Sequence, residues 1–87
     1  MPALQMGSFI VVNNSGNDVH AFVSNWTNSD GDESWFRLAA GSRDSWDRNG
    51  WECVGFKSVG DTHRAGKYIP VDRTVTFHGF DKKIDVE

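Results

Sequence analysis

The sequence predicts an all-β protein, namely an antiparallel β-sandwich or small barrel of seven to eight short strands joined mainly by hairpins. Three observations favour this class. Short runs of β-branched and aromatic residues recur along the chain, separated by two to seven turn-forming residues. No apolar pattern with helical spacing persists for three turns. The large apolar residues are mostly aromatic, with six Phe and four Trp against two Leu, and aromatic residues favour sheets.

The length of 87 residues predicts a single domain, residues 1–87, with room for one small core. A chain of this size buries about 60% of the surface that its unfolded state exposes, so it folds alone with a narrow margin. Residues 1–7 show no strand periodicity and are expected to form an irregular lead.

The first half of the chain predicts three strands separated by polar loops. In the second strand, alternation places Val19, Ala21 and Val23 on one face, which predicts that this face is buried. The short turn before it indicates that the first two strands pair as a hairpin. The strands are residues 8–13, 18–26 and 34–38, and the loops are residues 14–17 and 27–33.

The second half predicts four or five further strands. Val54 and Phe56 are the expected core residues of the strand that follows Asn49-Gly50. Pro70 cannot donate a backbone hydrogen bond, so its strand is expected to lie at an edge or to end there. These strands are the one that leads to Asn49-Gly50 and residues 51–57, 63–71, 74–78 and 84–86.

Asn49-Gly50 is the strongest local turn signal, because both central positions of a type I′ hairpin turn need positive φ. Such a turn would place Arg48 opposite Trp51 and Trp46 opposite Cys53, all on one face. Arg48 over Trp51 would then be an exposed cation–π pair. Trp51 lies at the tip, where burial is hardest, whereas Trp46 lies further back and is expected to be structural.

The four Trp are too many for the core of an 87-residue chain, so some are expected at the surface. Trp26 precedes the polar loop and Trp35 follows it, so these two are expected to flank one site. Exposed Trp rings stack on the apolar face of a pyranose, while polar side chains bind its hydroxyls. We therefore expect a non-enzymatic recognition domain for glycans or glycolipid head groups. The predicted ligand-binding residues are Trp26, Asn28, Asp30, Asp32, Trp35, Arg48 and Trp51.

The same residues are also compatible with two other functions. Trp side chains on a loop rim also suit a membrane interface, which would make the protein a lipid-surface binder. Alternatively, the domain binds only protein partners, with a Trp patch or a sheet edge buried in a homo-oligomer. In a third interpretation each Trp closes one end of the core and binds nothing.

Composition argues against several function classes. The net charge is −3 without a basic cluster, so no nucleic-acid partner is expected. No stretch has transmembrane length, and no secretory signal is evident, which favours a cytoplasmic protein or one released without a signal peptide. A single cysteine excludes an internal disulfide, and Cys53 is expected to be a small buried residue. No catalytic motif is evident, and no cofactor is expected.

Calcium is the one metal that the sequence leaves as a candidate ligand. Asp30, Asp32 and Glu33 concentrate oxygen ligands in one loop, but the glutamate that an EF-hand needs is replaced by Ala39. A solvated loop is therefore the preferred interpretation. The spacing of Trp46, Trp51 and Phe56 is similar to βγ-crystallin motifs, which implies calcium in the acidic loops as an alternative.

The run FIVVNNSGNDV, residues 9–19, resembles the first hairpin of aegerolysin-like and actinoporin-like β-sandwiches. The later run WDRNGW, residues 46–51, looks like small fungal proteins of the same kind, related to fruit-body lectins. This resemblance implies a disulfide-poor, Trp-rich β-sandwich. It also implies recognition either of a carbohydrate, as in a lectin, or of a lipid surface, as in a cytolysin.

Overall fold

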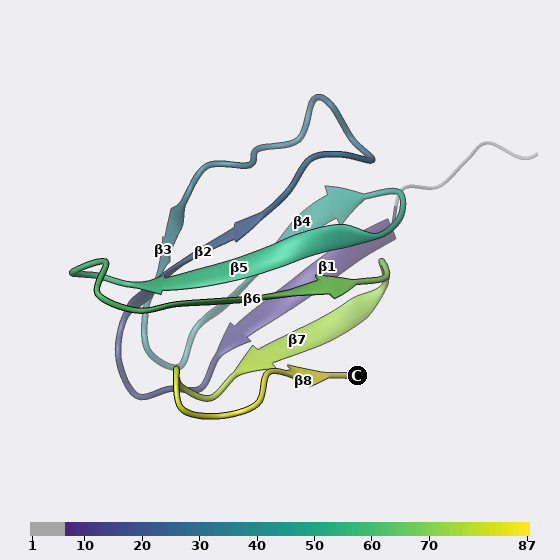
Figure 1. Ribbon diagram of the computed structural model, residues 1–87. Helices are drawn as coiled ribbons and strands as arrows, with labels where there is room; N and C mark the ends of the chain where they lie inside the picture. Colours follow the sequence, from purple (N-terminus) through teal and green to yellow (C-terminus); the bar gives the residue numbers. More distant parts are fainter. Residues whose placement is uncertain (1–6) are drawn as a thin grey trace, which may run out of the picture.

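The computed structural model describes residues 7–87, so the predicted irregular lead lies almost entirely outside the described residues. Eight strands and no helix make up this part of the chain, as the sequence predicted. With no helix described, none is long and apolar enough to cross a membrane. The strands are β1 (Gly7–Asn13), β2 (Val19–Val23), β3 (Phe36–Leu38), β4 (Arg43–Arg48), β5 (Glu52–Ser58), β6 (Arg64–Ile69), β7 (Arg73–Phe77) and β8 (Asp85–Val86) (Figure 1).

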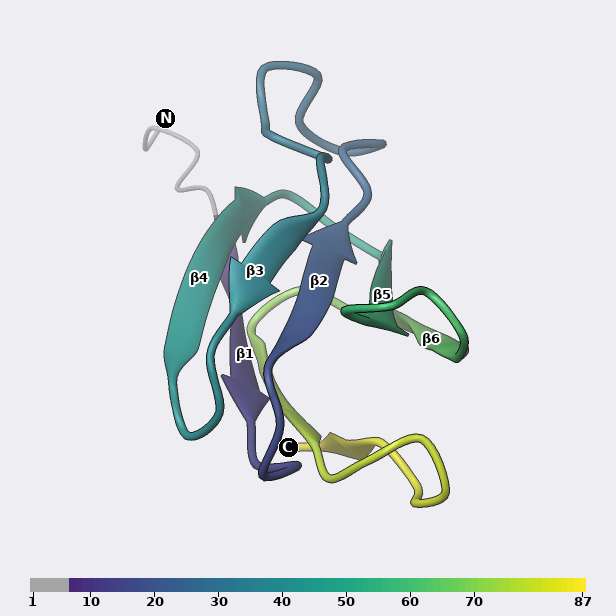
Figure 2. The ribbon, with the colours of Figure 1, turned by 90° about the vertical axis from the view of Figure 1, so that its left-hand side faces the viewer.

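The strands form two four-stranded sheets, ordered β4-β1-β7-β8 and β3-β2-β5-β6. Figure 2 shows them as two separate layers, and neither closes into a barrel. Five of the six strand pairs are antiparallel, whereas β1 and β7 run parallel. The prediction of an all-β protein is therefore confirmed, and its antiparallel pairing holds except at β1–β7.

The prediction that hairpins join most strands is wrong. Only β2–β3, β5–β6 and β7–β8 pair with their neighbours in sequence, whereas the other connections cross between the sheets. In particular, β1 pairs with β4 and β7 instead of β2. The turn residues at 14–17 are compatible with either course, because turn chemistry reverses the chain without selecting the next partner.

The predicted hairpin at Asn49-Gly50 is also wrong. Neither residue is among those with positive φ, so the type I′ turn is not formed. The strands on either side belong to different sheets, with Trp46 opposite Phe9 of β1 and Cys53 opposite Tyr68 of β6. The connection 49–51 is therefore a crossing between layers, and the predicted Trp46–Cys53 pairing does not exist.

The core lies between the sheets and draws on both of them. The predicted alternation in β2 is confirmed, since Val19, Ala21 and Val23 are all buried. Across the layers Phe56 of β5 stacks on Phe77 of β7, with ring centroids 4.4 Å apart. Strand pleating produces this pattern, because successive side chains point to opposite faces of a sheet.

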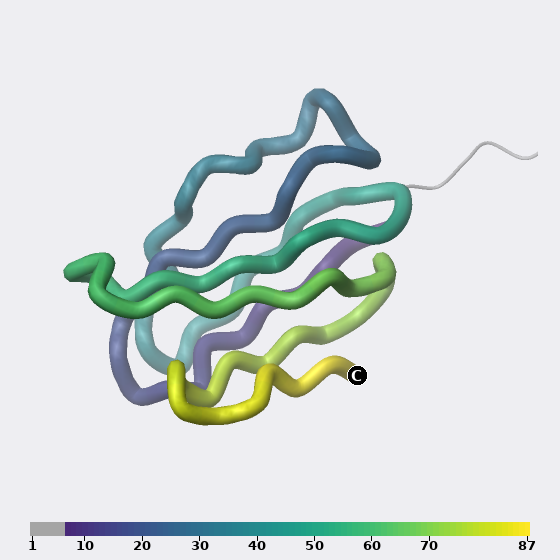
Figure 3. Tube along the Cα trace, in the orientation of Figure 1, coloured from purple at the N-terminus to yellow at the C-terminus, as the bar shows by residue number. Residues whose placement is uncertain are grey.

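Three segments meet at one end of the molecule. The long connection between β2 and β3 extends beyond its sheet at the end where β4 turns into β5 (Figures 1 and 3). The C-terminal end of β6 lies at the same end, and Pro70 follows it directly. The strand predicted to be limited by Pro70 is thus an edge strand of its sheet, as expected.

Candidate ligand-binding site

Three exposed aromatic side chains meet at this end of the molecule. The Tyr68 ring lies 5.1 Å from the Trp51 ring and 6.1 Å from the Trp26 ring, measured between centroids. Trp26, Trp51 and Tyr68 are 67%, 50% and 59% exposed, so a large apolar area faces solvent. Isolated exposed apolar residues are ordinary, but a contiguous patch marks an interaction surface. We call these three residues the aromatic cluster.

A buried carboxylate holds the backbone beneath Trp26. Glu52, at the start of β5, is 0% exposed. Its Oε1 accepts hydrogen bonds from the Ser24 hydroxyl at 2.6 Å and from the Trp26 amide at 3.1 Å. Its Oε2 accepts from the Thr27 amide at 2.7 Å and from the Thr27 hydroxyl at 2.5 Å. These four bonds satisfy the charge that burial would otherwise destabilise.

A buried guanidinium fastens the same loop from the other side. Arg48 is 1% exposed, and its Nε lies 3.9 Å from Oε2 of Glu52. The Nε atom donates to the carbonyl of Ser24 at 2.6 Å, and Nη2 donates to those of Val23 and Asp32 at 2.9 and 2.6 Å. Because Arg48 bonds to main-chain oxygens, it fixes the course of the β2–β3 connection.

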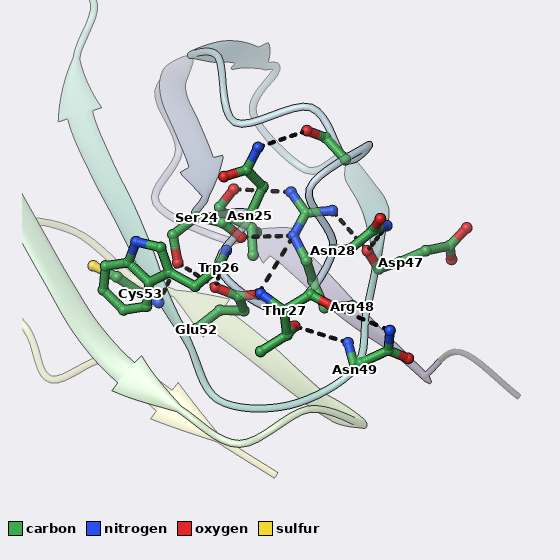
Figure 4. A network of polar contacts seen from close by, with 12 residues as sticks. Ser24, Asn25, Trp26, Thr27, Asn28, Asp47, Arg48, Asn49, Glu52 and Cys53 are labelled. Atoms are coloured by element: carbon green, nitrogen blue, oxygen red, sulfur yellow. Dashed lines mark hydrogen bonds and ion pairs between the residues drawn. The ribbon is translucent and has the colours of Figure 1, made fainter. Parts of the chain in front are cut away.

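The two segments that carry the cluster's Trp residues are also bonded directly to each other. The Asn49 amide donates to the Thr27 hydroxyl at 2.9 Å, and the Asn49 side chain donates to the Thr27 carbonyl at 3.1 Å. Asn28 donates to the Asp47 carbonyl at 3.0 Å. Figure 4 shows these bonds surrounding Arg48 and Glu52. These exposed bonds add to the buried bonds of Glu52 and Arg48, so the loops are held in place as a preorganised site requires.

The Glu52 carboxyl makes stability depend on pH. Burial alone would raise its pKa, but the hydrogen bonds from Ser24, Thr27 and Trp26 together hold the pKa below its usual value of 4.5. The unfolded state therefore binds a proton more readily than the folded state. The stabilisation is present above about pH 4.5 and is lost as the pH falls through the lower folded pKa.

We therefore expect that Glu52→Gln flattens the dependence of stability on pH. Urea denaturation of wild type and variant, between about pH 7 and about pH 3, measures the two free energies of unfolding. The curves should converge in acid, because protonated Glu52 and Gln both lack the charge that the folded state favours. Parallel curves would show that Glu52 is not the group responsible.

The structure divides the predicted site residues into three groups. Trp26 and Trp51 come together in the aromatic cluster, although the sequence placed Trp26 beside Trp35. Arg48 is buried and does not form the predicted cation–π pair with Trp51.

A separate cavity of about 380 Å³ is lined by Asn28, Asp30, Asp32 and Arg48 together with residues that include Phe36 and Trp46. Trp46 is buried, as the sequence predicted.

Trp35 lies on the outer face of the β3-β2-β5-β6 sheet, away from the cluster. Its ring packs edge-on against Phe22 at 4.7 Å. The Lys57 ammonium lies 4.7 Å from the Trp35 ring centroid and the Arg64 guanidinium 5.6 Å from it. Trp26 and Trp35 are thus separate features, because the long connection carries them to different parts of the sheet.

The acidic loop shows no metal centre among the residues that the structure describes. Nowhere in residues 7–87 do three His, Cys, Asp or Glu side chains gather closely enough to hold an ion. Asp32 instead accepts hydrogen bonds from the hydroxyl and amide of Ser34, at 2.6 and 2.8 Å, and these bonds lower the pKa of Asp32. Asp30 and Glu33 are exposed, as in the predicted solvated loop.

Sequence reasoning missed Tyr68, which touches both other members of the cluster. The sequence feature that could have indicated Tyr68 is the β5–β6 hairpin, because its register places Tyr68 opposite Cys53 on the outer face of the sheet. Cys53 is half-buried there instead of lying in the core. Burial raises the pKa of its thiol, and the neighbouring Glu52 carboxylate raises it further. The thiol is therefore held in its protonated, less nucleophilic form.

Comparison of the chain with protein-family models, curated proteins and solved structures finds no match. The function must therefore be argued from the site itself.

Proposed function

We propose that the two sheets form a β-sandwich recognition domain, which binds a glycan or a glycolipid head group at the aromatic cluster. One observation carries the proposal: three exposed aromatic rings meet, Trp26 and Trp51 on loops that a buried polar network holds in place and Tyr68 on strand β6. Such rings bury large areas on binding and lose little conformational freedom. Preorganisation lowers the cost of binding, because the loops are ordered before the ligand arrives.

The chemistry of the cluster suits a sugar. Its rings offer flat apolar faces to the C–H groups of a pyranose, and their polar atoms lie at the ring edges. Within residues 7–87, neither indole N–H group nor the Tyr68 hydroxyl has an intramolecular hydrogen-bond partner. These three polar groups can therefore bond to sugar hydroxyls that surround a stacked ring.

A glycan array tests this function. We expect wild type to give specific hits and Trp26→Ala or Trp51→Ala to weaken them by about 30-fold or more, as for anchor residues worth at least about 2 kcal/mol. Val59→Ala is the matched control, because Val59 is an exposed apolar residue outside the cluster. Thermal denaturation of each variant shows whether the fold is retained. Hits that survive both Trp substitutions would contradict the proposal.

Lipid-surface binding is a second candidate, favoured by the position of the cluster at one end of the molecule. Trp and Tyr concentrate where apolar and aqueous phases meet, as at the surface of a bilayer. Co-sedimentation with protein-free liposomes, combined with a silent glycan array, would favour this function. A homodimer that buries the cluster would appear by light scattering, and Trp51→Ala would dissociate it.

A further inference from the structure

The outer face of the β3-β2-β5-β6 sheet carries a row of basic side chains. Strand register places them directly opposite one another, one on each strand. Because cross-strand partners share a face, all four project to the side that carries Tyr68. The row consists of Arg37, His20, Lys57 and Arg64, and we call it the basic row.

The charges of the basic row are only partly neutralised. Arg37 pairs with Asp18 at 3.1 Å, and Arg64 makes two bonds of 2.8 Å to Asp61. Lys57 has no carboxylate within ion-pair distance among residues 7–87. It lies over the Trp35 ring and beside Arg64. One unpaired positive charge therefore remains near the centre of the row.

The surface between the basic row and the aromatic cluster contains two glycines and therefore few bulky side chains. Every second residue of β6 projects to this face, namely Arg64, Gly66 and Tyr68. Gly66 has no side chain, so open surface separates the Tyr68 ring from the Arg64 guanidinium. Gly66 lies opposite Gly55, over which the Phe22 ring packs. Tyr68 and Arg64 are four residues apart, about 13 Å at the rise of an extended strand.

We propose that this face selects an acidic saccharide, with a sugar ring stacked on the aromatic cluster and a carboxylate or sulfate bound at Lys57, which lies opposite Arg64. The proposal rests on the proposed function and adds the charge and the minimum length of the ligand. The separation of the two ends requires more than one sugar ring. The Phe22 ring lies over Gly55 beside this path, with the Trp35 ring packed edge-on against it.

Charge complementarity favours a sparsely charged saccharide over a nucleic acid. A nucleic acid presents one phosphate for every nucleotide and is bound through several cations along its backbone. Here Asp18 and Asp61 neutralise two of the three permanent cations, and the whole chain carries a net charge of −3. A single unpaired lysine matches a ligand with few, well-separated anionic groups.

An array of neutral glycans and their carboxylated or sulfated counterparts tests the proposal. We expect the acidic member of a bound pair to bind more tightly, and Lys57→Gln to reduce that preference by about threefold to fivefold, as for an exposed ion pair. Lys57→Arg should restore it. Lys67→Gln is the control, because Lys67 lies one position from Tyr68 on β6 and points to the other side of the sheet. The preference should also weaken between about 0.01 M and about 1 M salt.

The outcomes separate this inference from the proposed function. If neutral and acidic glycans bind equally and Trp51→Ala abolishes both, the recognition function stands and the acidic specificity is wrong. If Lys57→Gln leaves the preference unchanged, the anion site is wrongly placed. If the array is silent, both proposals fail. Tight binding of a single-stranded oligothymidylate, reduced by Lys57→Gln, would replace the saccharide with a nucleic acid.

Discussion

Replacement of Arg48 by Met should lower the free energy of unfolding by about 3 to 5 kcal/mol, measured by urea denaturation. The change leaves the Glu52 carboxylate buried without its cationic neighbour. It also leaves the carbonyls of Val23, Ser24 and Asp32 without the donors that now satisfy them. Buried polar groups that lose their partners bear the full cost of desolvation.

The control for this prediction is Arg37→Met. Arg37 also pairs with an aspartate, but both side chains are exposed, so its loss should cost far less than the loss of Arg48. The double variant Arg48→Met/Glu52→Gln should recover part of the stability, because it removes the uncompensated charge. Equal losses for Arg48→Met and Arg37→Met would show that the buried network contributes little.

Because Arg48 also fixes the loop that carries Trp26, the same variant connects stability to binding. Under the proposed function, any fraction that stays folded should bind glycan more weakly than wild type, since its aromatic cluster is no longer preorganised. Binding measured under conditions where both proteins are fully folded separates this effect from unfolding. Unchanged affinity would mean that the loop keeps its course without the guanidinium.

Replacement of Phe56 by Ala should lower the free energy of unfolding by about 3 to 5 kcal/mol. The Phe56 ring is fully buried and stacks on Phe77 at 4.4 Å, so it joins the two sheets across the core. A small domain has a total stability of roughly 0.05 to 0.15 kcal/mol per residue. The substitution therefore removes a large share of the stability, and denaturation is best measured at low temperature.

Phe36→Ala is the matched control for Phe56→Ala. The Phe36 side chain is 42% exposed and touches Trp46 only at the margin of the core, with ring centroids 6.0 Å apart. Its truncation removes less buried area and leaves less of a cavity, so it should cost clearly less. Similar losses for the two variants would contradict the placement of the core between the sheets.

Local patterns in the sequence determined the secondary structure. The alternation of Val19, Ala21 and Val23 predicted a buried face because strand pleating depends only on the chain's own backbone. Trp51 is exposed as predicted, but it lies on a crossing between the sheets and not at the hairpin tip on which that prediction rested. Pro70 marked the end of an edge strand because it lacks the hydrogen-bond donor that an interior strand needs.

The tertiary structure alone decided which strands pair and which residues form the site. Asn49-Gly50 indicated a reversal, but the strands on either side of it pair in different sheets, so the segment crosses between the layers. That crossing buries Arg48, which local pattern placed on the surface, and brings it to the carbonyls of a distant loop. Tyr68 joins Trp26 and Trp51 through contacts between segments far apart in sequence. Such long-range contacts depend on how the whole chain closes, so no local pattern records them.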